Sequence, residues 1–94
     1  MKLATPITAH GETLSEITLK RPTAAQAREI GALPYRVGED GVPQPLVAPA
    51  CRYIAVCAGI PPSSVDQLDI TDLNALAWEV VGFFVNGASA TSES

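Results

Sequence analysis

The chain has 94 residues, enough for one domain, with 47% hydrophobic and 17% charged side chains and a net charge of −4. This composition is typical of a globular protein and argues against disorder. The six basic residues are scattered, whereas phosphate backbones need clustered positive charge, so nucleic-acid binding is disfavoured. No apolar run approaches the ~20 residues that span a bilayer, and no signal-peptide pattern is present, so we expect a cytoplasmic protein without membrane association.

Alternating apolar and polar residues on both sides of Gly11 predict a β-hairpin over residues 7–20. Thr and Ile are enriched in both halves, as is typical of strands, and Gly11-Glu12 fits the turn. Leu14 is out of phase with Ile17, which indicates a bulge or a late start of the second strand.

A short helix and a surface loop are predicted next. Thr23 and Gln26 have the spacing of a capping box, so we expect a helix over residues 24–30. Residues 33–45 contain two Gly and three Pro. We interpret this stretch as a surface loop, in which a little extended structure is an open alternative, with a turn at residues 38–41.

The second half of the chain is predicted to be helical. Residues 46–58 are apolar on nearly every side, which indicates a buried central helix. Ser64 and Gln67 follow two prolines at capping-box spacing, so we expect a helix of one to two turns there.

A final helix is predicted over residues 71–86, with Asp69 or Thr71 as its cap. From Leu73 onward, apolar residues recur at i, i+3, i+4, i+7 and i+8. This spacing gives the helix one face that packs against the core.

The fold class predicted from these elements is α+β. We expect a small single domain over residues 1–87, in which an N-terminal β-hairpin is followed by three to four α-helices. Residues 88–94 have only small and polar side chains, so this tail is expected to be disordered.

The sequence lacks the converging groups that catalysis requires. His10 is the only histidine and is interpreted as an exposed strand-end residue. Asp66, Asp69 and Asp72 recur at every third residue, but they coincide with helix starts, where free amides stabilise carboxylates. Capping is therefore preferred to metal binding, and no catalytic residue, metal or cofactor is predicted.

Cys51 and Cys57 fall in one predicted helix, about 9 Å apart along its axis and about 120° apart around it. They cannot pair without unwinding that helix. The chain has no CxxC pattern that would indicate a metal or redox site. We expect both thiols to be reduced, inert and buried.

The last helix carries more apolar surface than one packed face needs. Trp78 and Val85 lie about 120–140° from Leu73, beyond the arc that ends with Val81, and Phe83 widens the opposite edge. The apolar arc covers roughly 220°, against the ~100° stripe of a one-sided helix. Two interpretations remain open. Either the domain wraps this helix on two sides, or Trp78, Val81, Phe83 and Val85 bind a partner or a second copy.

Two groups of motifs lie toward the two ends of the chain. They are Pro6-Ile7-Thr8, His10-Gly11-Glu12 and Ile17-Thr18-Leu19-Lys20-Arg21-Pro22-Thr23 near the start, and Gly59-Ile60-Pro61-Pro62-Ser63-Ser64-Val65-Asp66-Gln67-Leu68 and Asp72-Leu73 later. In these motifs the chain resembles the tail assembly chaperones of Mu-like bacteriophages and prophages. The block that begins at Pro61 is the most specific match, and the proline-rich stretch 42–49 matches nothing diagnostic.

The resemblance implies a protein that binds the long, aggregation-prone tape measure protein in the bacterial host cytoplasm during tail assembly and is absent from the mature virion. In several such systems a ribosomal frameshift produces a longer second form, so a frameshifted form of this chain and self-association are further partners to consider. A rival interpretation is a generic oligomerisation or adaptor domain without enzymatic activity. That rival predicts no affinity for a tape measure protein.

Overall fold

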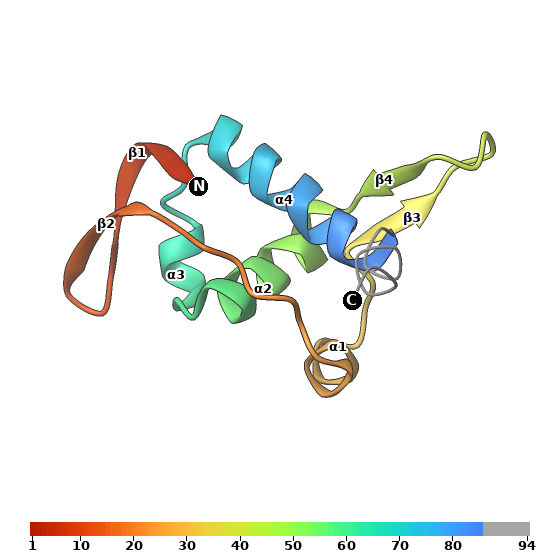
Figure 1. The fold of residues 1–94 in the computed structure, drawn as a ribbon, viewed down its shortest axis with the longest axis horizontal. Helices are drawn as coiled ribbons and strands as arrows, with labels where there is room; N and C mark the ends of the chain where they lie inside the picture. Colours follow the sequence, from red (N-terminus) through yellow and green to blue (C-terminus); the bar gives the residue numbers. More distant parts are fainter. Residues whose placement is uncertain (86–94) are drawn as a thin grey trace, which may run out of the picture.

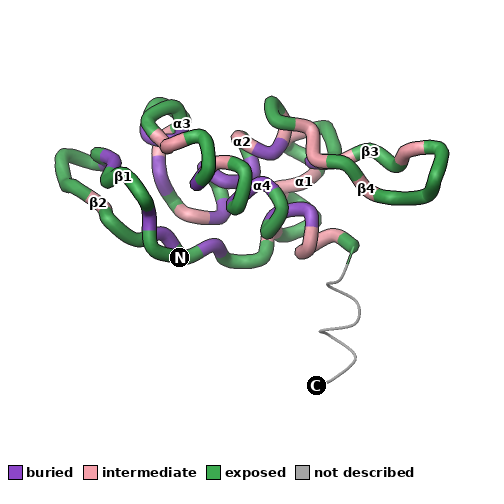
Figure 2. The backbone as a smooth tube through the Cα atoms, turned by 90° about the horizontal axis from the view of Figure 1, so that it is seen from above, coloured by how far each residue is buried: buried purple, intermediate pink, exposed green. Residues whose placement is uncertain are grey.

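Two β-hairpins lie at opposite ends of a set of packed helices (Figures 1 and 2). The computed structural model describes residues 1–85, so the expected tail, residues 88–94, lies outside the described residues. The predicted α+β fold is confirmed, because an N-terminal hairpin precedes four helices within the described residues. The elements in chain order are β1 (Lys2–Ala9), β2 (Glu12–Glu16), α1 (Ala24–Ile30), β3 (Tyr35–Val37), β4 (Pro43–Pro45), α2 (Val47–Ala58), α3 (Pro62–Val65) and α4 (Ile70–Val85).

The β1–β2 hairpin corresponds to the one predicted over residues 7–20. His10 and Gly11 join the strands with positive φ angles of 54° and 78°. Two such residues form a hairpin turn whose twist matches that of the flanking strands. The turn therefore lies one residue earlier than Gly11-Glu12, and the first strand starts earlier than expected, at Lys2.

The predicted irregularity in this hairpin lies in β1 and not in β2. Lys2 faces Glu16 and Ile7 faces Leu14, so β1 contains extra residues between the two pairs. Bulged residues leave backbone groups without a partner in the neighbouring strand. Another element must therefore satisfy the amides of β1 at this point.

Side chains in α3 and just after it bind the backbone of β1. Ser64 donates from its hydroxyl to the carbonyl oxygen of Thr8 at 2.7 Å, and the Gln67 amide oxygen accepts from the Thr8 amide at 2.8 Å. The predicted capping box of Ser64 and Gln67 is therefore wrong, because α3 begins at Pro62 and both side chains bind a strand distant in sequence. Ser64 and Gln67 attach the first hairpin to the helices and do not cap a helix.

Ser64→Ala should lower the free energy of unfolding by about 1 kcal/mol, because it removes one buried hydrogen bond to Thr8. Ser63→Ala, at an exposed neighbouring position, should change it by less than about 0.5 kcal/mol. Urea denaturation of the two variants measures the difference. Equal stabilities would show that the Ser64 hydroxyl does not hold the hairpin.

Residues 33–45, interpreted from the sequence as a loop, contain the second hairpin, β3–β4. The turn predicted at residues 38–41 is confirmed, and the amide of Gly41 donates to the carbonyl of Gly38 at 3.0 Å. Prolines obscured the strands in the sequence, because proline cannot donate to a ladder and is confined to edge strands. This hairpin extends away from the helices (Figure 1).

The helix boundaries predicted from local signals are confirmed for α1 and α2. The Thr23 hydroxyl accepts from the Gln26 amide at 3.1 Å, and the Gln26 side chain accepts from the Thr23 amide at 2.9 Å. Helix α2 matches the segment predicted over residues 46–58 and ends at Gly59, whose φ of 72° only glycine adopts without strain.

Helix α4 is fastened to the rest of the domain along one side. Leu76 and Val80 have no exposed surface. Near the helix end, Phe84 packs edge-on against Tyr53, with ring centroids 5.2 Å apart, and lies 6.2 Å from Tyr35. The helix expected over residues 71–86 is therefore confirmed up to Val85, and its last expected residue lies outside the described part of the chain.

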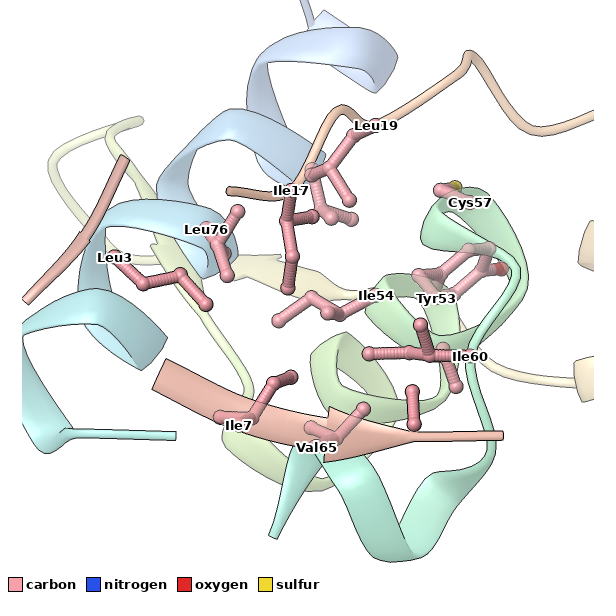
Figure 3. Packing of buried hydrophobic residues seen from close by; sticks show 13 residues of the cluster. Leu3, Ile7, Ile17, Leu19, Tyr53, Ile54, Cys57, Ile60, Val65 and Leu76 are labelled. Atoms are coloured by element: carbon pink, nitrogen blue, oxygen red, sulfur yellow. The ribbon is translucent and has the colours of Figure 1, made fainter. Parts of the chain in front are cut away.

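The core forms where the first hairpin meets α2 and α4 (Figure 3). Ile54 on α2 is fully buried and lies among side chains from β1, from the segment after β2 and from α4. The core uses α4 on one side only, which leaves part of this helix uncovered. Labelled core residues are Leu3, Ile7, Ile17, Leu19, Tyr53, Ile54, Cys57, Ile60, Val65 and Leu76.

Candidate functional site

Helical geometry determines which side of α4 faces solvent. Trp78 lies between Leu76 and Val80 in sequence, yet it is 47% exposed while they are 0% exposed. Successive residues are about 100° apart around a helix, so Trp78 lies opposite these two core residues. The large aromatic side chain therefore lies on the surface.

Beside Trp78 lies a groove of about 340 Å³, bounded by the first half of α4, the start of α2 and the end of β4. Ile70 is 74% exposed and Val47 is 61% exposed, so apolar side chains dominate its rim. A concave apolar surface of this kind is typical of a docking site. We call it the Trp78 groove. Its lining residues are Pro45, Val47, Ile70, Leu73, Asn74, Ala77 and Trp78.

The four residues predicted to bind a partner do not form one surface. Trp78 lines the groove, and Val85, 39% exposed, lies two turns further along the same side of α4. Phe83 is half-buried and lines a separate hollow beside α1. Val81 is only 2% exposed, on a helix that contacts both α2 and β4, so we exclude it from the candidate surface.

Of the residues that line the groove, only Trp78 was predicted from the sequence as a site residue. The α4 residues that line the groove recur at i, i+3, i+4, i+7 and i+8 from Ile70 to Trp78. A helical face counted from Ile70 instead of Leu73 therefore contains all of them. Val47 and Pro45 come from the proline-rich stretch. No local pattern in the sequence places them beside Trp78, since the second hairpin and the packing of α2 bring them there.

The Asp69 carboxylate caps α4, as predicted. It accepts a hydrogen bond from the Thr71 amide at 3.1 Å and a short one from the Thr71 hydroxyl. These bonds, the hydroxyl's first, lower the pKa of Asp69. Asp66 is exposed at the end of α3. Within residues 1–85, no group of three or more His, Cys, Asp or Glu side chains is placed to hold a metal ion.

Asp72 has a different role from the capping role predicted for it. Its side chain is buried, and one carboxylate oxygen accepts from the Ala4 amide at 2.7 Å and from the Thr5 amide at 3.4 Å. These are the amides at the irregularity in β1. Asp72 thus joins the first hairpin to the helix that carries the groove.

Within residues 1–85, the remaining reactive side chains do not converge on a site. His10 is exposed, as predicted, and its Nε2 lies 3.3 Å from the carbonyl oxygen of Gly59. Cys51 and Cys57 are both free thiols, which confirms that they are not paired with each other. Their chemical inertness stays a prediction.

Cys57 should resist alkylation in the folded protein. Burial, and then the negative charge of Glu79, raises the pKa of its thiol to about 11, so about one molecule in a thousand carries the thiolate at pH 8. Iodoacetamide should therefore modify the half-buried Cys51 before Cys57, and both equally in urea. Mass spectrometry of a labelling time course measures this order, and fast labelling of Cys57 without urea would contradict it.

The sequence matches the family described as "Phage tail assembly chaperone proteins, E, or 41 or 14" over residues 1–85. The match includes both hairpins and the helices α1 to α4, so the chain belongs to this family of phage tail assembly chaperones. The predicted resemblance is confirmed, and it also extends through the proline-rich stretch 42–49. No curated protein and no solved structure matches the chain. None of the helices within residues 1–85 is both long and apolar enough to cross a membrane.

Proposed function

We propose that this chaperone binds an apolar segment of the tape measure protein in the Trp78 groove and keeps it soluble in the host cytoplasm during tail assembly. The observation that supports this function is a half-exposed Trp in an apolar groove, on a member of a tail assembly chaperone family. Exposed tryptophans with aliphatic neighbours are typical anchors of protein interfaces.

The construction of the groove suits reversible capture. Leu73 packs against the core and Ala77 is buried, so these two form the floor of the groove, whereas Ile70, Val47 and Trp78 stand at its rim. The floor is fixed by the packing of α4, so binding requires little reordering of the backbone. A groove of this size covers one short segment, which lets the partner be released as the tail assembles.

We also propose that the protein acts by binding and not by catalysis, and that it is absent from the mature virion. The groove is lined by apolar side chains and one amide, Asn74, and its proposed role needs no nucleophile, metal or cofactor. Mass spectrometry of purified particles should therefore detect the tape measure protein but not this chain. Stoichiometric amounts of the chain in particles would contradict the proposal.

Co-expression with the tape measure protein tests the function directly. We expect the tape measure protein to be soluble and to purify with tagged chaperone, and to aggregate when expressed alone. A matched co-expression with an unrelated soluble protein of similar charge controls for expression level. A tape measure protein that remains insoluble with the chaperone present would refute the proposed function.

A further inference from the structure

The segment that supplies every lining residue of the Trp78 groove, residues 43–85, is poor in positive charge. Residues 43–85 contain four acidic side chains and a single basic one, Arg52, which lines a separate hollow with His10 at the end of the first hairpin. Of the acidic residues, Asp72 is buried. Glu79 lies near Cys57, whose thiol pKa is raised by burial and then by this charge.

The other two carboxylates, Asp66 and Asp69, lie near residues that adjoin the groove. Asp69 immediately precedes Ile70, the most exposed residue of the rim. Asp66 lies near Cys51, because burial and then the charge of Asp66 raise the pKa of that thiol. Cys51 is one helical turn beyond Val47 on the opposite wall of the groove. Asp69 is therefore next to the rim of the apolar groove, and Asp66 lies near the α2 turn that follows its opposite wall.

The strand beside the groove is poorly suited to pair with an extended partner. Gln44 faces Arg36 in the β3–β4 ladder, and backbone hydrogen bonds two residues before and after this pair show that Gln44 faces β3. The nitrogens of Pro43 and Pro45 then face away from β3. A proline nitrogen carries no hydrogen, so β4 offers no amide donor on that side. A helix satisfies its own backbone and fits alongside the ridge of α4.

We propose that the occupant of the Trp78 groove is an amphipathic helix of the tape measure protein whose apolar stripe is flanked by Lys or Arg that face Asp66 and Asp69. This inference rests on the proposed function and adds the class of segment that is recognised. The apolar stripe supplies the contact with Trp78, while the flanking charges select among the many apolar segments of a long partner.

Two synthetic helical peptides with the same leucine stripe test the inference. One carries Lys at the flanking positions and the other carries Glu. Trp78 is the only tryptophan, so its fluorescence reports binding to the groove without a label. At low salt we expect the Lys peptide to bind about tenfold more tightly than the Glu peptide, and the ratio to fall as salt screens the charges.

Asp66→Asn combined with Asp69→Asn should reduce this ratio to about threefold or less, and asparagine keeps the cap of α4. Glu79→Gln, which removes a charge near Cys57 and not at the groove, should leave the ratio unchanged. Equal affinities of the two peptides, or a ratio unaffected by the double variant, would overturn the inference. If the chaperone still solubilises the tape measure protein in that case, the proposed function survives and only the charge selection fails.

Sedimentation velocity of the protein alone tests whether a second copy of the chain occupies the groove instead. The inference expects a monomer at micromolar concentration, with Trp78 emission typical of a solvated indole. A dimer whose Trp78 is already shielded would assign the groove to a second copy and would also overturn the inference.

Discussion

Trp78→Ala is expected to weaken binding of the tape measure protein by more than about 2 kcal/mol, roughly 30-fold, because it removes the main anchor of the groove. The side chain is 47% exposed, so its removal should change the free energy of unfolding by less than about 1 kcal/mol. Pull-down of co-expressed tape measure protein, beside a thermal melt of the purified variant, measures both effects.

Val81→Ala is the matched control and should show the opposite pattern. Val81 is 2% exposed, so truncation should cost about 1–3 kcal/mol of stability and leave binding intact at temperatures where the variant is folded. If Trp78→Ala melts early, Trp78 belongs to the core and not to a site. If that variant is folded and still captures the partner, the binding surface lies elsewhere, with the first hairpin and residues 33–45 as the next places to test.

Asp72→Ala is expected to lower the free energy of unfolding by about 2–3 kcal/mol. The buried carboxylate accepts hydrogen bonds from the amides of Ala4 and Thr5, and bonds to a charged group are worth more than neutral ones. Without it, the Ala4 and Thr5 amides in the irregular part of β1 lose their acceptor on α4. Urea denaturation measures the loss, and hydrogen exchange at Ala4 should accelerate.

Asp72→Asn separates the hydrogen bonds from the charge. Its amide oxygen still accepts from Ala4, so this variant should lose less stability than Asp72→Ala. Equal losses in the two variants would mean that the negative charge, and not the acceptor geometry, stabilises β1. A stable Asp72→Ala variant would show that water replaces the carboxylate at this exposed edge.

Local signals predicted the helices well, because their causes lie within a few residues. The capping box of Thr23 and Gln26 and the apolar run of α2 depend only on nearby sequence. The same spacing at Ser64 and Gln67 wrongly predicted a helix cap, because both side chains bind Thr8, more than fifty residues away in the chain. A local pattern cannot distinguish a cap from a long-range contact.

The candidate site was predictable only in part. Helical geometry indicated that Trp78 lies outside the packed arc, and it does. The burial of Val81 and the presence of Val47 in the groove depend on how β4 and α2 pack against α4. The second hairpin was interpreted as a loop, so the element that shapes one wall of the groove was absent from the sequence-based prediction.

Site-specific photocrosslinking tests the central claim, that the tape measure protein binds in the Trp78 groove, most directly. A photoreactive phenylalanine analogue at Ile70, 74% exposed on the groove rim, is compared with one at Val56, 40% exposed at the separate hollow near His10. In cells that co-express the tape measure protein, the account predicts a crosslink from Ile70 and none from Val56. A crosslink from Val56 alone would contradict it and place the binding surface on the opposite side of α2.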